Sequence, residues 1–286
     1  STIFWYNLTS TQKIVEEEVY NSFYTSMDTG AAELASVFRD ARNLTLELCA
    51  NTSVQRALRQ DDAAWQDEEQ KIQAARQSSE NLTRFFPTFN AEIYGLDAEH
   101  QLFGADNIKN ISEEWLQAVL RAQGQFVWDY HYTEYGSSVR VSHLIYDEQN
   151  WEQPLGIVSV YVNSDYLRYA LNSIRLGNNT VVYLLDAKGN LLFPYETGAS
   201  IPENVGETVT IAGSASGRSA FVMRRLSVNG FRIVGEARDF DALKEITAQR
   251  KTILLLALTA LTISVLAALL LTYHISTPIL ALSNIM

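Results

Sequence analysis

The chain has 286 residues, with 22 Lys or Arg against 33 Asp or Glu, which gives a formal net charge of −11. Such an acidic chain lacks the basic surface that nucleic-acid binding requires, so DNA and RNA are excluded as partners of this region. Its length predicts about two domains, and its apolar fraction of 47% excludes a disordered chain.

The N-terminal part is predicted to be helical. Residues 1–6 read STIFWY and are expected to be the end of a truncated first transmembrane helix, because Trp and Tyr favour the membrane interface. Residues 8–59 contain no proline, and apolar side chains recur every three to five positions, which predicts one long helix or two end to end. Residues 62–84 follow as another helical stretch. We therefore assign a long spine helix and a second helix to residues 7–83.

Residues 84–176 have the pattern of an antiparallel sheet flanked by helices, an α+β arrangement. A helix is expected from Ser112, which offers an N-cap, to Gly124, which offers a C-terminal stop. A short helix over residues 164–174 closes the module. The strands are expected in FNAEIYGLD, HQLFGAD, QFVWDYHYT, SVRVSHLIYD and PLGIVSVYVN.

Residues 177–245 repeat this plan at a smaller size. A hairpin, TVVYLLDAKGNLLF, is followed by strand-like runs in TVTIAG, RSAFVMRRLSV and FRIVGEA. The segment VYLLDAKGNLLF resembles IYGLDAEHQLF of the preceding module, since both place Leu-Asp-Ala between two apolar strands. Two similar modules in tandem are the predicted organisation.

Residues 252–273 read TILLLALTALTISVLAALLLTY and contain no charge, proline or glycine. Because a helix rises about 1.5 Å per residue and the hydrocarbon core is about 30 Å thick, this run predicts a transmembrane helix. Residues 7–251 are expected outside the cytoplasm and 274–286 inside. Arg250 and Lys251 alone would favour the reverse orientation. They are outweighed because only 13 residues follow the run and the opening residues resemble a second membrane edge.

Motifs of catalysis and nucleotide binding are absent from the sequence. It contains no GxSxG, no GxxxxGK[ST] and no GxGxxG after a strand, and its four histidines lack a metal-ligand spacing. We therefore predict no catalytic residue, no metal site and no cofactor. The single cysteine, Cys49, excludes an intramolecular disulfide and is expected to pack as a small apolar side chain.

Aromatic side chains are concentrated between residues 115 and 151, interleaved with charged ones. Strand alternation places Trp128, Tyr130 and Tyr132 on one face. Flat rings with a few charges suit a pocket for a small polar ligand, whereas the alternative is an ordinary sheet core. The candidate ligand-binding residues are Trp115, Trp128, Tyr130, Tyr132, Arg140, Tyr146 and Asp147.

The last residues, HISTPILALSNIM, resemble the start of a HAMP linker, in which Pro278 opens an amphipathic helix over residues 276–286. With the long entry helix, the tandem modules and the apolar run, the whole chain resembles the double-Cache region of bacterial sensors. The segments ELCANTSVQRAL, SEEWLQAVLRAQGQFVW and STPILALSNIM are most similar to YesM-type sensor histidine kinases.

This resemblance implies a long N-terminal helix, two tandem PAS-like Cache modules and one transmembrane helix. It also implies a homodimeric, membrane-integral receptor of the bacterial cell membrane. Its membrane-distal module, residues 84–176, would bind a small extracellular ligand or a binding protein that carries one. Its HAMP and kinase core would lie beyond Met286.

Amino-acid-sensing double-Cache domains carry Arg-x-Trp-Tyr, where this chain has Glu113, Trp115 and Leu116. Arg140 would then have to bind a ligand carboxylate from a strand. A chemoreceptor, a membrane-anchored AraC-type regulator, an adhesion or structural ectodomain and a surface hydrolase with paired carboxylates are the alternatives.

Overall fold

A computed structural model describes residues 2–59, 68–96, 101–104, 112–133, 136–176, 179–193, 201–202, 204–214, 217–238, 255, 258–260 and 262–270. Side chains are described from residue 17 onward, except at 68, 132–133, 136–137, 213–214 and 217–218. The chain divides into a folded body, Ser22–Arg238, and a second unit made of residues 1–21 and 239–286. Each is described by itself.

The expected helices are found, the first two end to end and the third packed against the second. α1 spans Thr2–Cys49, α2 spans Thr52–Leu58 and α3 spans Glu68–Thr83. Asn51 separates the first two because its side-chain oxygen accepts hydrogen bonds from the backbone N–H groups of Ser53 and Val54, at 3.0 and 3.2 Å. This is the geometry of an N-cap, so a new helix starts here rather than continuing the old one.

The first sheet has five antiparallel strands in the order β2-β1-β5-β4-β3. Its strands are β1 (Phe89–Gly95), β2 (Gln101–Phe103), β3 (Val127–Thr133), β4 (Gly136–Asp147) and β5 (Asn150–Val162). α4 (Glu113–Arg121) lies between β2 and β3 in the chain, and α5 (Ser164–Ser173) follows β5. The turn expected near residues 97–100 lies outside the described residues.

The second sheet repeats this topology in the order β7-β6-β10-β9-β8. Its strands are β6 (Thr180–Leu185), β7 (Leu191–Phe193), β8 (Thr210–Ser214), β9 (Gly217–Arg225) and β10 (Arg232–Ala237). Tyr94 of β1 pairs with Ile157 of β5, and Tyr183 of β6 pairs with Val234 of β10 in the same way. The repeat seen in the sequence is therefore a repeat in structure.

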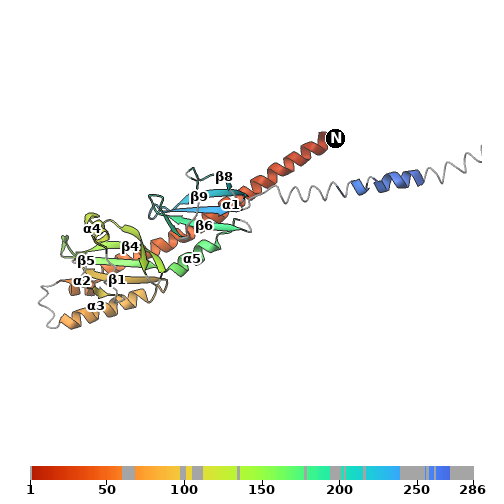
Figure 1. The fold of residues 1–286 in the computed structure, drawn as a ribbon. Coiled ribbons are helices and arrows are strands. Elements are labelled where there is room, and N and C mark those ends of the chain that lie inside the picture. The colour runs from red at the N-terminus through yellow and green to blue at the C-terminus, as the bar shows by residue number, and fades with distance from the viewer. Residues whose placement is uncertain are drawn as a thin grey trace, which may run out of the picture. The chain divides into compact units, whose positions relative to one another are not determined.

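α1 lies alongside both sheets in the folded body (Figure 1) and packs against one face of each. Phe38, which is fully buried, makes edge contacts with Trp128 of β3 and with Phe231, at ring-centroid distances of 5.6 and 5.9 Å. Near the other end of this contact, a Cβ added to Gly235 of β10 would lie 2.7 Å from the Met27 sulfur. The two sheets thus share one helix as part of their cores.

The membrane predictions fall mainly outside the described residues. Residues 2–6 are helical within α1, and residues 255, 258–260 and 262–270 are helical within the apolar run. Among the residues that the structure describes, no helix is both long and apolar enough to cross a bilayer. The rest of residues 252–273 and the predicted HAMP start at 276–286 lie outside the described ranges.

Candidate functional site

The outer face of the first sheet, opposite α1, is partly covered by α4. Ser112 caps this helix as expected, since its hydroxyl oxygen accepts a hydrogen bond from the backbone N–H of Trp115 at 3.1 Å. Trp115 and Val119 are buried on the sheet, against Tyr94, Leu144 and Ile157. The cap and this apolar contact together fix the indole ring of Trp115 over the strands.

Arg140 of β4 lies directly beneath this indole ring. Its guanidinium binds the carboxylate of Asp129, its cross-strand neighbour in β3, through two hydrogen bonds of 2.8 and 2.5 Å. The guanidinium carbon is 4.2 Å from the Trp115 ring centroid. Burial acts to lower the pKa of Arg140, but the hydrogen bonds and charge of Asp129 raise it above its ordinary value. Arg140 is therefore a permanent buried cation whose charge is balanced within the sheet.

Glu92 of β1 accepts hydrogen bonds from two tyrosine hydroxyl groups. Tyr94 of the same strand and Tyr161 of β5 both donate hydrogen bonds to its Oε2 atom. Burial raises the pKa of both tyrosines, and the negative charge of Glu92 raises them further. Both phenols consequently stay protonated at neutral pH and act as donors.

Two serines join α4 to the middle of the sheet. The indole N–H of Trp115 donates to the Ser142 hydroxyl at 3.1 Å, and this hydroxyl lies 2.9 Å from that of Ser159. Ser142 of β4 and Ser159 of β5 are cross-strand neighbours. We call the set formed by Glu92, Tyr94, Trp115, Asp129, His131, Arg140, Ser142, Ser159 and Tyr161 the outer-face network.

His131 of β3 joins this network through its ring, whose centroid is 5.6 Å from that of Tyr161. Its pKa is lowered, mainly by burial and further by the positive charge of Arg140. The imidazole is therefore uncharged at neutral pH, and the ionic side chains of the network are Arg140, Asp129 and Glu92.

Of the predicted site residues, the structure brings Trp115 and Arg140 together. Tyr146, at the end of β4, packs against the apolar cluster that holds Trp115. Sequence reasoning missed Glu92, Tyr94, His131, Ser142, Ser159 and Tyr161 as members. It missed Asp129 as well. The available signals were Glu92, a carboxylate between apolar residues of a predicted strand, and Asp129, a charge within the aromatic run.

Trp128 and Tyr130 lie on the other face of β3. Trp128 precedes Asp129, so alternation directs the two side chains to opposite faces, and Trp128 packs on Phe38 of α1. Tyr130 shares the face of Trp128 by the same alternation. The structure thus does not bring these two residues to the outer-face network. The side chain of Tyr132 lies outside the described ones.

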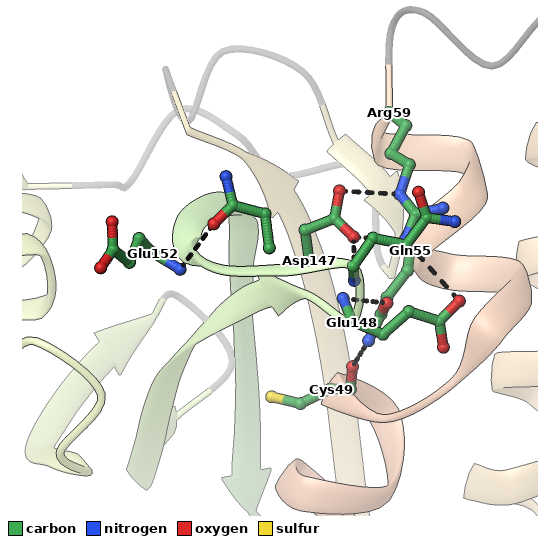
Figure 2. Close-up of polar contacts among 8 residues, drawn as sticks. Cys49, Gln55, Arg59, Asp147, Glu148 and Glu152 are labelled. Carbon is green, nitrogen blue, oxygen red and sulfur yellow. Dashed lines mark hydrogen bonds and ion pairs between the residues drawn. The ribbon is translucent and has the colours of Figure 1, made fainter.

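Asp147, the last predicted residue, lies at the far end of β4 (Figure 2). Its carboxylate accepts two hydrogen bonds from the guanidinium of Arg59 and one from the backbone N–H of Gln149. The Gln149 hydrogen bond, together with Arg59, holds the pKa of Asp147 below its usual range. Asp147 therefore connects Arg59, the residue after α2, to the β4–β5 turn. It lies at the opposite end of β4 from Arg140.

Gln55 of α2 adds to the same attachment. Its amide N–H donates to the Cys49 carbonyl at 2.9 Å, and its amide oxygen accepts from the backbone N–H of Glu148 at 3.1 Å (Figure 2). Burial raises the pKa of the Cys49 thiol to about 12, so the thiol stays protonated. Cys49 thus behaves as the packed side chain that was expected.

The second sheet carries a smaller polar group on the matching face. Tyr183, the counterpart of Tyr94, donates to Oε2 of Glu236 at 2.6 Å, and Ser219 donates to Oε1 at 3.0 Å. Arg238 forms an ion pair with Glu236 at 3.2 Å. Both oxygens of this buried carboxylate are thus bonded. Across the described ranges, no three His, Cys, Asp or Glu side chains gather as a metal site.

No protein-family model matches the chain, and no curated protein matches its sequence. Solved structures match its fold. The sensory domain of the Campylobacter jejuni chemoreceptor Tlp3 with isoleucine bound is 12% identical, with a TM-score of 0.55 over 80% of this chain and 96% of that one. The ligand-binding domain of the Pseudomonas aeruginosa amino acid chemoreceptor PctB, in complex with L-Arg, is 14% identical, with a TM-score of 0.55 over 77% and 95%.

A domain of a sensory box/GGDEF family protein from Vibrio parahaemolyticus is 11% identical, with a TM-score of 0.53 over 77% of this chain and 96% of that one. The chain therefore has the fold of these sensory domains, and the two sheets show the expected pair of similar modules. Its assignment to the YesM-type kinases stays a prediction.

Proposed function

We propose that this chain is the ligand-sensing extracytoplasmic region of a bacterial transmembrane signalling receptor. The observation that carries the proposal is its two-module fold, which matches nearly the full length of sensory domains from several bacterial signalling proteins. Those of Tlp3 and PctB hold amino acids in their structures. In this chain the ligand, free or delivered by a binding protein, binds the first module.

The outer-face network is the place at which we expect this ligand to bind. It combines aromatic rings, from which a ligand gains apolar contact area, with charged groups that fix a ligand's orientation. Trp115 comes from α4, while its partners come from the sheet. A ligand between helix and sheet would therefore alter how α4 packs.

We place the acidic part of the chain, residues 7–251, outside the cytoplasm and residues 274–286 inside, with membrane helices at the N-terminus and over 252–273. The uncharged run of 22 residues supports this arrangement. The described residues of the run expose large apolar side chains that water disfavours, namely Leu255, Leu258, Ile263, Val265, Leu266, Leu269 and Leu270. The receptor is proposed to work as a homodimer.

The proposed output is a histidine kinase whose HAMP linker begins at residue 276 and whose catalytic core follows Met286. A chemoreceptor is the second candidate, favoured by the match to chemoreceptor sensory domains. The residues after Met286 in the full-length receptor discriminate the two, since a kinase core and a chemoreceptor signalling helix have unmistakably different sequences.

A thermal-shift screen of the whole chain in detergent tests the proposal, with amino acids, organic acids, sugars, nucleosides and amines as additives. A ligand at a hundred times its dissociation constant adds about 2.7 kcal/mol to the free energy of unfolding. We expect a hit that Trp115→Phe weakens and that Arg59→Gln, a matched change outside the network, leaves intact. A hit that survives every change in the network, or no hit at all, contradicts direct sensing at this site.

A further inference from the structure

The charges of the outer-face network do not cancel. Arg140 and Asp129 neutralise each other through two hydrogen bonds, and His131 is uncharged. Glu92 is left with two phenol donors, which bind its carboxylate but carry no positive charge. The network as described therefore has one negative charge in excess.

Arg140 is poorly placed to bind a ligand carboxylate. One face of its guanidinium lies against the Trp115 indole, and its Nε and Nη2 atoms are bonded to Asp129. A ligand carboxylate that binds this edge of the guanidinium in a bidentate way would have to displace Asp129 and leave that charge without its partner at a partly buried position. Removing one partner of such a pair is strongly unfavourable, so the exchange offers little gain.

Glu92, by contrast, has a carboxylate oxygen that can accept further hydrogen bonds. Both tyrosine hydroxyls converge on Oε2, and Oε1 receives no hydrogen bond from the described residues. A carboxylate oxygen accepts readily from a charged N–H donor, and such charge-assisted bonds are stronger than neutral ones. Tyr94 and Tyr161 meet this carboxylate with their hydroxyl groups, while their rings contact Trp115 and His131.

We propose that the first module senses an organic cation without a free carboxylate, a primary ammonium compound that donates its N–H groups to Glu92. This inference rests on the proposed function and names the chemical class of its ligand. Asp129 and Arg140 serve as a neutral, preformed wall of the site rather than as a carboxylate clamp.

The second sheet provides an internal comparison for this assignment. Glu236 is buried, whereas Glu92 is half-buried, and both bind a tyrosine; both oxygens of Glu236 are occupied and Arg238 balances its charge. Nothing there favours an added cation. Glu236→Gln is therefore a control for Glu92→Gln, because both changes replace a carboxylate that binds a phenol by its isosteric amide.

Four probes with the same five-carbon skeleton separate the possible ligand charges: pentylammonium, pentan-1-ol, pentanoate and norvaline. Isothermal titration calorimetry of the whole chain in detergent measures their affinities. We expect pentylammonium to bind roughly tenfold or more tightly than pentan-1-ol, as a hydrogen bond to a charged group implies, and pentanoate to bind most weakly. Tighter binding of norvaline or pentanoate than of pentylammonium overturns the inference.

Glu92→Gln keeps the shape of the side chain and removes its charge. We expect it to weaken pentylammonium binding roughly tenfold and to leave pentan-1-ol unchanged, while Glu236→Gln changes neither. Equal losses in the two variants would place the cation elsewhere and overturn the assignment. The probe series on the unaltered chain decides the ligand class even where a variant fails to fold.

Failure of this inference is distinguishable from failure of the proposed function. If none of the four probes binds, or if the broad screen identifies a neutral or anionic ligand instead, the cation assignment falls. The sensor proposal falls only when the broad screen also yields no ligand.

Discussion

The two sheets of the folded body share one topology but differ in what covers their outer faces. In the first module, α4 lies between the second and third strands and lays Trp115 over the sheet. In the second module, Ile201 and Val205 pack on the corresponding face, and the described residues between β7 and β8 form no helix. The same scaffold thus carries a helix over a polar network in one copy, and Ile201 and Val205 beside a smaller polar group in the other.

The shared tyrosine shows how far the two copies have diverged. Tyr94 and Tyr183 occupy the same register and both donate to a carboxylate. The acceptor is Glu92 on the tyrosine's own strand in the first module, but Glu236 on the neighbouring strand in the second. A buried phenol requires an acceptor, and more than one strand position can supply it.

Replacing Phe38 by alanine is expected to have the largest effect, because this buried ring contacts Trp128 beside one sheet and Phe231 beside the other. Truncation of such a ring costs about 3–5 kcal/mol of unfolding free energy. All five tryptophans precede residue 177, so their fluorescence reports mainly on the first module and, through Trp128, on its contact with Phe231. Urea unfolding of Phe38→Ala can be monitored both by tryptophan fluorescence and by circular dichroism. We expect the two probes to give different transition midpoints, because the modules no longer unfold together.

Phe85→Ala is the control, since Phe85 is 80% exposed and its loss should change stability by no more than about 0.5 kcal/mol. Coincident transitions in Phe38→Ala would mean that the two modules unfold together without this ring, contrary to the comparison above.

A pair of glycine substitutions has the next largest effect. A Cβ on Gly156 would lie 2.4 Å from the backbone carbonyl oxygen of Tyr94, which the β1–β5 pairing holds in place. A Cβ on Gly235 would lie 2.3 Å from the end of the Leu176 side chain, which can rotate away. We expect Gly156→Ala to lose about 1–3 kcal/mol and Gly235→Ala to lose less. Chemical denaturation measures both, and the reverse order would contradict this prediction.

The smallest effect concerns acid sensitivity, which should belong to the first module because residues 177–245 contain no histidine. The pKa of His131 is lowered in the folded chain, so the unfolded chain binds a proton first as the pH falls. This stability is present above about pH 6.5 and is lost below it. We expect the melting temperature to fall less between about pH 7.5 and pH 5 in His131→Gln than in the unaltered chain. Parallel curves would show that His131 does not contribute.

Much of the fold was predictable from the sequence because strands and helices impose different periods. The strands around Ile93 and Tyr183 appear where alternation placed them, and the repeat of Leu-Asp-Ala marked the duplication. The sequence did not distinguish one long helix from two that meet at Asn51. A single polar residue in a helical pattern does not reveal whether its side chain caps the backbone.

The site was only half predictable, for a physical reason. Alternation correctly grouped Trp128 with Tyr130, but it does not say which face of a strand meets α1. Glu92 and Tyr161 are 69 positions apart in the chain, and only strand register brings them together. Trp115 and Arg140 were candidates because aromatic and charged side chains suit a ligand pocket, and the structure places them in contact.

Two adjacent residues of β3 connect the outer-face network with the second module. Asp129 belongs to the outer-face network, while Trp128 touches Phe38 and lies 6.3 Å, ring to ring, from Phe231 at the edge of the second module. One peptide bond joins them, and the backbone between them is stiff. A displacement of Asp129 would therefore pass to Trp128 through the strand itself, and the contacts of Trp128 with Phe38 and Phe231 involve no loop between them.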